Sequence, residues 1–224
     1  MPPAALSILR PEADEPASLS ERAYYSIREL IVSLELAPGA VVSERELMER
    51  LGLGRTPIRE ALRTLAQEKL VEVYPRRGIF VSPVDVGDLA ALSEARIALE
   101  GVAARLAARR ATPVDRELAR ALLDELPEAA LEPDERALIE LDQRIHRHVY
   151  RCAHNPFIES TLNEYYILTL RIWFLALDRV ARLDDAVTEH RELLEAICDG
   201  DSARAEDVMR RHIEGFERAI RAVL

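Results

Sequence analysis

The chain has 224 residues, a formal net charge of −10 and a sequence pI near 5.1. This length suffices for a substantial core and favours two domains over one. Nucleic-acid binding depends on basic side chains that neutralise phosphates. The negative net charge therefore excludes a protein that coats nucleic acid non-specifically, and any DNA contact must be confined to one part of the surface. The sequence contains neither an apolar run long enough for a membrane span nor a signal-peptide pattern at its start. We therefore expect a soluble, cytoplasmic protein.

Residues 1–17 contain four prolines and are expected to form a disordered tail. From Ser18 onward, apolar residues recur at spacings of three and four and predict a helix. Ser43 and Glu46 match a capping box, which predicts the start of a second helix. The elements expected in residues 18–83 are a helix from Ser18 to the turn at Pro38-Gly39, helices from Glu44 to about Arg50 and from Arg55 to about Lys69, and strands Val71–Tyr74 and Ile79–Val81. Two short helices around a tight turn followed by a hairpin outline a winged helix-turn-helix, a DNA-binding fold.

Residues 84–224 follow a linker around Pro83 and are dominated by helical periodicity. The helices expected are Asp88 to Arg110, Pro113 to about Leu126, Asp134 to Ala153, Pro156 to about Asp178, Leu183 to Asp199 and Asp201 to Val223. Short loops between long amphipathic helices predict an antiparallel helical bundle, so the whole chain is expected to be mainly α. Residues 18–83 carry a net charge of +1 and residues 84–224 carry −9, so the acidity belongs to the second domain.

In the second predicted helix of the helix-turn-helix, Arg55, Arg59 and Arg63 stand at i, i+4 and i+8 and share one side. An arginine can donate two hydrogen bonds to the O6 and N7 of guanine, and the two nearest the helix start are best placed to do so. The alternative is a solvated helix face with no ligand. The capped helix, the glycine turn and the basic hairpin together favour DNA binding.

Further contacts with DNA are expected outside this stripe. Arg45 and Thr56 can hold the phosphate backbone and set the register. At the hairpin tip, Arg76 and Arg77 precede Gly78, where the missing side chain allows a close backbone approach to the minor groove or to phosphates.

The stretch E-L-A-P-G-A-V-V-S-E-R-E-L, L-G-L-G-R-T-P-I-R-E-A-L and P-R-R-G-I-F-V closely resembles the N-terminal domain of the GntR family of bacterial transcription regulators. The resemblance covers about Ala23 to Pro83. It implies that residues at matching positions approach the operator or lie at the wing tip, here Arg45, Arg55, Thr56, Arg59 and Gly78. One departure is Gly54, where the family usually has Ser or Thr to cap the recognition helix; glycine is a less stabilising cap.

A second constellation lies in the helical domain. Asp142 and His146 stand at i and i+4 on one apolar helix face and should point inward. His190 and His212 lie ten residues before and twelve residues after Gly200, so an antiparallel hairpin places them at nearly the same level. Three imidazoles and one carboxylate suit a divalent transition metal such as zinc, nickel or manganese. The alternative for each single inward histidine is a hydrogen-bonded core residue.

The motifs L-D-Q-R-I-H, T-E-H-R-E-L-L-E-A-I and R-R-H-I-E are similar to the FCD effector domain of the FadR subgroup of GntR regulators. That resemblance spans about Asp88 to Val223. It implies one metal ion per chain, held by residues matching Asp142, His146, His190 and His212, with a small organic acid bound beside or directly on the metal.

Arg96 lies between Leu92 and Leu99 on the inward face, where a guanidinium requires a carboxylate partner. That partner is either an effector carboxylate or Glu100, one turn along. Arg171 and Asn163 are weaker candidates for effector contacts.

Together with the resemblance to GntR regulators, which implies a small organic acid as effector, these patterns predict a metabolite-responsive transcription repressor that binds palindromic operator DNA as a homodimer. Two alternatives stay open. A metal sensor would use the ion itself as effector, and a metalloenzyme would use the histidine cluster to activate water. The arginine stripe and the wing argue against an enzyme.

Overall fold

The computed structural model describes residues 18–126, 135–176 and 183–223, so the predicted tail lies outside the described residues. Contacts divide the chain into two compact units. The first comprises the residues up to Asp85 together with Leu170–Leu175, and the second comprises Val86–Thr169 together with Ala176–Leu224. In the described residues, no helix is long and apolar enough to cross a membrane.

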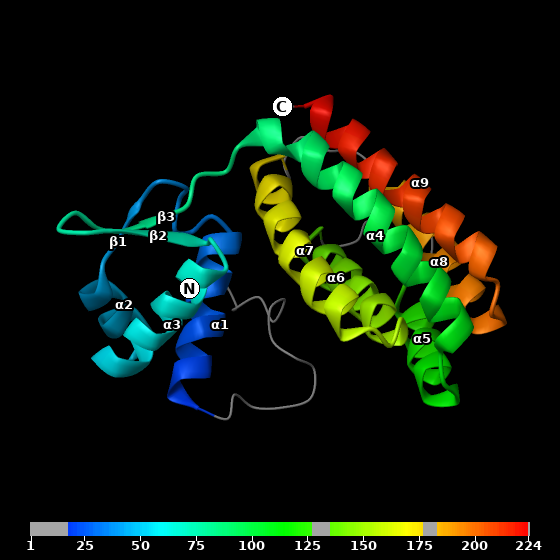
Figure 1. Ribbon diagram of the computed structural model, residues 1–224, viewed down its shortest axis with the longest axis horizontal. Coiled ribbons are helices and arrows are strands. Elements are labelled where there is room, and N and C mark those ends of the chain that lie inside the picture. Colours follow the sequence, from blue (N-terminus) through cyan, green and yellow to red (C-terminus); the bar gives the residue numbers. More distant parts are fainter. Residues whose placement is uncertain (1–17, 127–134, 177–182, 224) are drawn as a thin grey trace. The chain divides into compact units, whose positions relative to one another are not determined.

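The first unit is a winged helix-turn-helix (Figure 1). Its three strands are antiparallel in the order β1-β3-β2. The two-residue strand β1 was not predicted from the sequence; it pairs Val41 with Phe80 and Val42 with Ile79. The elements are α1 (Leu19–Val32), β1 (Val41–Val42), α2 (Glu44–Leu51), α3 (Arg55–Gln67), β2 (Val71–Tyr74) and β3 (Gly78–Val81).

Local chemistry explains where these helices begin and end. The Ser43 side chain accepts a hydrogen bond from the Glu46 amide, and Gly52, in the left-handed region at φ 65°, ends α2. Helix α3 begins after Gly54, which provides no side-chain cap. Apolar side chains of α1 and α3 pack together, including Ile27, Ile31, Ile58, Leu62 and Leu65, each fully buried. This packing leaves the opposite side of α3 in solvent.

The second unit consists of helices, as predicted, with a short 3₁₀ turn at Val86–Asp88 before the first of them. Their bounds lie within two residues of the predicted ones, and the expected end of α7 falls outside the described residues. They are α4 (Leu89–Arg110), α5 (Pro113–Glu125), α6 (Glu135–Cys152), α7 (Pro156–Ala176), α8 (Leu183–Asp199) and α9 (Ser202–Arg221), except that Leu170–Leu175 of α7 count with the first unit.

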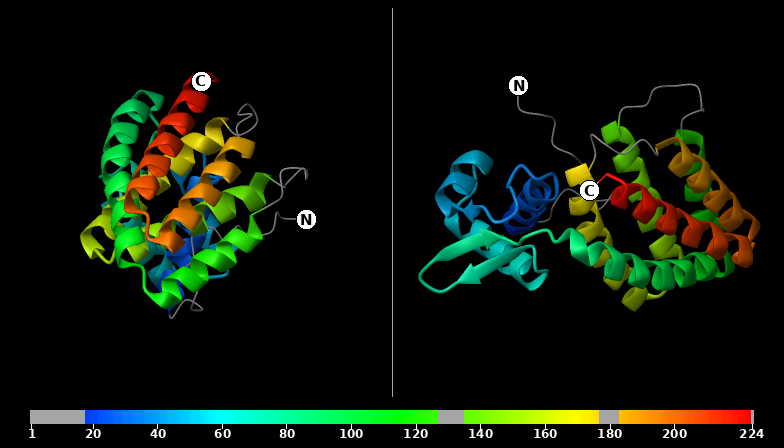
Figure 2. Two further views of the ribbon diagram at one scale, coloured as in Figure 1. Left: turned by 90° about the vertical axis from the view of Figure 1, so that its right-hand side faces the viewer. Right: turned by 90° about the horizontal axis from the view of Figure 1, so that it is seen from above.

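Helix α4 packs along α9 and also contacts α6 and α8 (Figure 2, left). The C-terminal half of its buried face consists of small residues, among them Ala103, Ala104 and Ala107. At Gly101, an added Cβ would lie 3.1 Å from Cγ of Arg210 on α9, so the two helices approach closely there. This arrangement brings Glu100 of α4 against His146 of α6.

Candidate metal centre and DNA-reading face

The structure brings together the four side chains predicted as metal ligands. Asp142 and His146 come from α6, His190 from α8 and His212 from α9, and all four are buried. One potential ligand atom from each lies within 4.8 Å of the others. Asp142 Oδ1 is 3.2 Å from His190 Nε2, 3.8 Å from His146 Nε2 and 3.9 Å from His212 Nε2. Two ligands of a tetrahedral ion with bonds of about 2 Å lie about 3.3 Å apart, so these separations are of the right size for one shared ion.

Two further carboxylates orient two of the imidazole rings. His146 Nδ1 lies 2.8 Å from Glu100 Oε2, and His212 Nδ1 lies 2.9 Å from Glu189 Oε2. Because an ionised carboxylate only accepts hydrogen bonds, each Nδ1 must be the protonated nitrogen that donates. In the neutral ring, Nε2 then carries a lone pair that faces the cluster. Carboxylates in this position are common behind histidines that bind metals.

With these protonation sites, the two Nε2 atoms of His146 and His212 cannot form a hydrogen bond with each other. His146 Nε2 and His212 Nε2 are 3.2 Å apart, and with both Nδ1 atoms protonated neither Nε2 of a neutral ring has a proton to donate. His190 Nε2 is buried and has no hydrogen bond of acceptable geometry within the described chain, although Asp142 Oδ1 lies close. A cation shared by these nitrogens would satisfy all of them.

Protonation states also suit a cation. Burial alone would raise the pKa of Asp142, but the neighbouring His146, His190 and His212 hold it well below its usual value. Burial and the nearby His190 lower the pKa of His212 to about 4, so this ring is neutral near pH 7. Tyr166 donates to Asp142 Oδ2, which leaves Oδ1 facing the histidines. The cluster therefore presents an ionised carboxylate and a neutral imidazole, the forms that bind metals.

The chain's two other histidines do not belong to this group. His148 is buried and contacts Cys152 Sγ at 3.3 Å. His154 is exposed at the end of α6, where its Nε2 lies 3.0 Å from Asp115 Oδ2.

Arg96 has Glu100 as its partner, one of the two alternatives that the sequence left open. The side chain is 3% exposed; its Nε donates to Glu100 Oε1 and its Nη1 donates to Thr169 Oγ1 at 3.1 Å. Burial alone would raise the pKa of Glu100, but Arg96 and His146 lower it to about 2. Arg96, Glu100 and His146 thus form one buried chain of polar contacts that reaches the metal cluster. Glu100 and Glu189 were not predicted as part of the metal site.

The other two candidates for effector contacts are engaged within the chain. Arg171 is buried, its Nη2 donates to the Ser82 carbonyl oxygen at 2.5 Å, and burial lowers its pKa to about 10. Its Nε has no hydrogen-bond partner within the described residues. Asn163 is half-buried and donates from Nδ2 to the Glu159 carbonyl oxygen of its own helix. Arg171 belongs to the first unit, whereas the four clustered side chains belong to the second.

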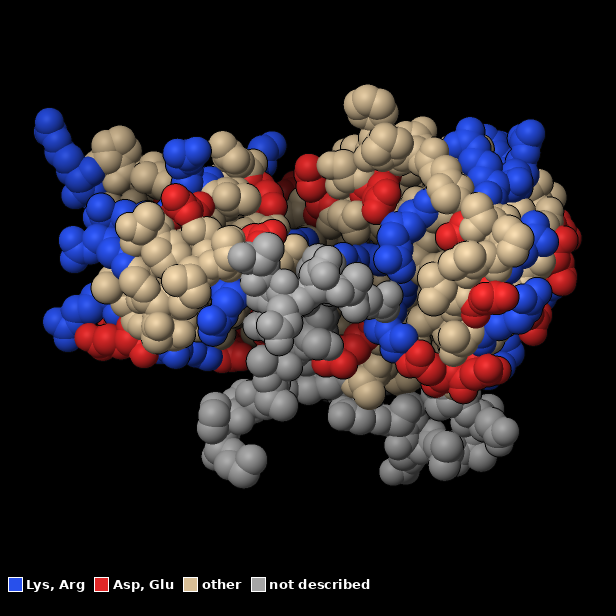
Figure 3. Space-filling view, turned by 90° about the horizontal axis from the view of Figure 1, so that it is seen from below, with Lys and Arg blue, Asp and Glu red and all other residues tan. Residues whose placement is uncertain are grey.

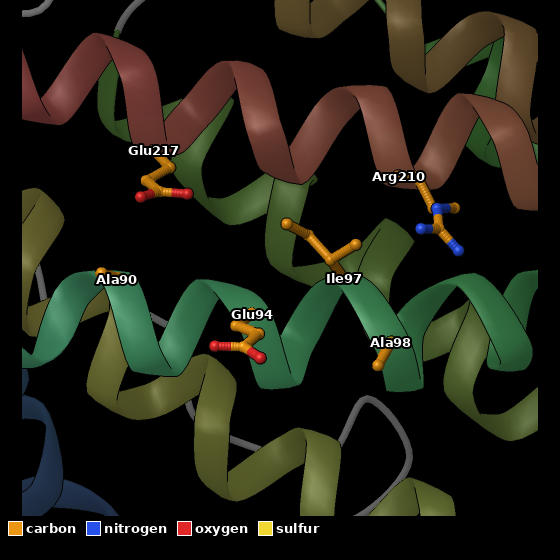
Figure 4. A pocket seen from close by; sticks show the side chains of 6 residues that line it. All are labelled: Ala90, Glu94, Ile97, Ala98, Arg210 and Glu217. Carbon is orange, nitrogen blue, oxygen red and sulfur yellow. The ribbon is translucent and has the colours of Figure 1, made fainter.

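A hollow of about 320 Å³ lies between α4 and α9 (Figure 4). Its walls include two acidic side chains and one basic one, and Glu217 also pairs with Arg221 at 2.8 Å. The residues that line it are Ala90, Glu94, Ile97, Ala98, Arg210 and Glu217. None of the predicted metal or effector residues is among them.

The residues predicted to contact DNA are all exposed on the first unit. They lie at the start of α2, along α3 and at the tip of the β2–β3 hairpin: Arg45, Arg55, Thr56, Arg59, Arg77 and Gly78. Figure 3 shows mainly Lys and Arg at the end of this unit on the left of the view. In the hairpin, the Arg77 guanidinium lies 5.8 Å from the centroid of the Tyr74 ring, and Gly78 has φ 112°, which favours glycine.

Comparison with known families agrees with both halves of this description. The family described as bacterial regulatory proteins, gntR family, matches residues 19–81, and the family described as FCD domain matches residues 91–215. The chain belongs to the GntR family of transcription regulators and carries an FCD domain. The resemblance seen in the sequence is thereby confirmed.

Individual relatives are also regulators. The chain is 33% identical over 195 residues to a probable D-xylose utilization operon transcriptional repressor of Paenarthrobacter nicotinovorans, covering 85% of each chain. It is 28% identical over 228 residues to the galactonate operon transcriptional repressor of Escherichia coli, covering 91% of this chain and 97% of the relative. Its fold matches E. coli McbR/YncC with a TM-score of 0.81 at 22% identity, covering 92% and 98% of the two chains. The family is one of regulatory proteins and the two sequence relatives are named as transcriptional repressors, not enzymes, which sets the metalloenzyme alternative aside.

Proposed function

We propose that this GntR regulator is a metabolite-responsive repressor whose FCD domain holds a divalent transition metal and binds a small organic acid. The observation that carries the proposal is the buried cluster of Asp142, His146, His190 and His212, whose ligand atoms lie within 4.8 Å of one another. A repressor role is supported by the names of the two relatives, both operon repressors.

The four residues fit a metal ion better than they fit a hydrogen-bonded core. A core network would leave His190 Nε2 without a proper partner, and it would set two Nε2 lone pairs against each other at 3.2 Å. Zinc, nickel and manganese all accept imidazole and carboxylate ligands, and the donor set does not choose among them. When bound, a metal that takes five or six ligands would supply a positive centre that can accept a carboxylate oxygen in addition to the four protein ligands.

The chain's own residues would hold and tune that centre. Glu100 and Glu189 fix the protonation of His146 and His212, and Tyr166 fixes the direction of Asp142. Arg96, Arg171 and Asn163 are the candidate contacts of the organic acid. Among them, Arg96 is connected to the cluster through Glu100, so we rank it first.

The winged helix-turn-helix of the first unit would recognise the operator DNA. Arg55 and Arg59 would contact guanines in the major groove, Arg45 and Thr56 would hold phosphates, and Arg77 with Gly78 would approach the DNA from the wing. We propose that two copies bind a palindromic operator as a homodimer in the cytoplasm. The acid would weaken operator binding by favouring a dimer arrangement that fits the operator less well.

A thermal-shift screen of small carboxylates tests the sensor. Because a ligand that binds only the folded state raises its melting temperature, at least one acid should do so with metal-loaded protein and fail with protein stripped by a chelator. An acid that raises the melting temperature equally without metal would contradict a metal-centred site. Operator affinity that follows free metal and ignores every acid would favour the metal sensor instead.

A further inference from the structure

Arg59 of α3 is held by an acidic residue of the neighbouring helix. Its Nε lies 3.0 Å and 2.9 Å from the two carboxylate oxygens of Glu44, the first residue of α2. The Arg59 side chain is 59% exposed and that of Glu44 is 30% exposed. No other polar contact of the Arg59 guanidinium is found in the described part of the chain.

This contact uses one part of the guanidinium and leaves another open. Nε donates to Glu44, whereas Nη1 and Nη2, which carry the remaining four N–H groups, stay available. Guanine offers O6 and N7 side by side in the major groove, and a pair of guanidinium N–H groups matches them. A side chain already fixed at Nε loses less conformational freedom when it makes that contact.

Other arginines on this face are held less firmly. No ion pair is found for Arg55 or Arg63 within the described residues. Arg45 pairs with Glu49 at 3.1 Å, but the two lie one turn apart on the same helix and are 86% and 65% exposed. Glu44, by contrast, bridges two helices and follows Ser43, which caps α2. Its backbone is therefore fixed where it holds Arg59.

We propose that Glu44 is a positioning residue that holds Arg59 for one guanine of the operator and thereby sets specificity. The inference rests on the proposed DNA-binding function of α3. Positioning of Arg59 and simple charge repulsion predict opposite changes in operator affinity when Glu44 is removed. A carboxylate near DNA repels phosphates, so its removal should strengthen all DNA binding if charge alone matters. If Glu44 positions Arg59, its removal should weaken binding to the operator alone.

The test uses a DNA duplex that the wild-type full chain selects from a random pool, and a scrambled duplex of the same composition. Affinities of wild type and Glu44→Ala for both duplexes are measured by fluorescence anisotropy over a range of salt concentrations. Glu46→Ala is the matched control, because Glu46 is an exposed glutamate in the same helical turn and has no ion pair with Arg59. Circular dichroism and melting temperature check the fold of each variant.

We expect Glu44→Ala to bind the selected duplex about fivefold or more weakly, within the range for one arginine–guanine contact, and to bind the scrambled duplex as well as or better than wild type. Glu46→Ala should not lose affinity for the selected duplex. In an Arg59→Ala background, Glu44→Ala should cause no further loss. Replacing the contacted guanine by 7-deazaguanine, which lacks N7, should weaken wild type and leave Glu44→Ala unaffected.

Two results would overturn the inference in different ways. If Glu44→Ala strengthens binding to both duplexes as Glu46→Ala does, Glu44 is only a repulsive charge, and operator recognition by wild type stands. If wild type selects no duplex over the scrambled one, the proposed DNA-binding function and this inference both fail.

Discussion

His146 Nε2 and His212 Nε2 lie 3.2 Å apart, and a carboxylate stands behind each ring, Glu100 behind His146 and Glu189 behind His212. Each carboxylate fixes the proton of its ring on Nδ1, so two lone pairs face one space together with Asp142 Oδ1. This relationship is the physical reason to expect a metal ion in the FCD domain.

Removal of two ligands should remove the metal. We expect purified wild type to contain about one ion per chain and the double variant Asp142→Ala, His146→Ala to contain almost none, since two of four ligands are lost. Elemental analysis by mass spectrometry measures the content. His154→Ala is the control, because that histidine is exposed, lies beside Asp115 and is not one of the four clustered residues. Full metal content in the double variant would refute the ligand assignment.

The two orienting carboxylates should differ in their effect on stability. Glu100→Gln and Glu189→Gln should each lower metal affinity, by about 10- to 100-fold, because each unfixes one ligand ring. Glu100→Gln also leaves the buried Arg96 without its ion-pair partner, which should cost about 3–5 kcal/mol in the metal-free protein. Metal titration and denaturant unfolding separate the two effects. If Glu189→Gln lowered the unfolding free energy of the metal-free protein as much as Glu100→Gln does, the loss would not be specific to the Arg96–Glu100 ion pair.

Glu100 should also make the metal-free protein sensitive to acid. Its pKa is about 2 in the folded chain against an ordinary 4.5, so the unfolded chain binds more protons between these pH values. The stabilisation, about 3 kcal/mol, is fully present above pH 4.5 and lost as the pH falls toward 2. Unfolding free energies of wild type and Glu100→Gln at pH 3–6 measure it, with exposed Glu94→Gln as the control. Parallel pH profiles for wild type and Glu100→Gln would argue against this assignment.

Arg55→Ala and Arg59→Ala should each abolish or strongly reduce specific operator binding while leaving the metal content unchanged. Each lost arginine–guanine contact is worth about 1–3 kcal/mol, or about 5- to 150-fold in affinity. Anisotropy with the selected duplex measures the loss, and Arg109→Ala, an exposed arginine on α4, is the control. Unchanged operator affinity in either variant would show that the replaced arginine does not contact the operator bases.

Much of the fold could be predicted because local signals agreed with the final structure. Helix α8 has the predicted bounds, and Asp201 caps α9 so that the helix begins one residue later than expected. The strand β1 was missed because its two residues, Val41 and Val42, form no pattern of their own. Their pairing depends on β3, which is far away in the sequence.

The grouping of the four candidate metal ligands was predictable for a related reason. Asp142 and His146 share a helix face at i and i+4, and Gly200 sets the level of His190 against His212. The roles of Glu100, Glu189 and Glu44 depend on which helices lie beside one another, and single-helix periodicity does not contain that information. For Arg96 the sequence left two partners open. Helix spacing places Glu100 one turn along from it, and the structure shows that Glu100 is the partner and that both side chains are buried.

We propose that an organic acid bound at the candidate metal centre controls operator binding. The most direct test titrates the selected duplex with wild type and with Asp142→Ala, His146→Ala, in the presence and absence of the acid found by thermal shift. We expect the acid to weaken operator binding by wild type about tenfold, a typical allosteric coupling, and to have no effect on the double variant. An equal response of both proteins to the acid would contradict it.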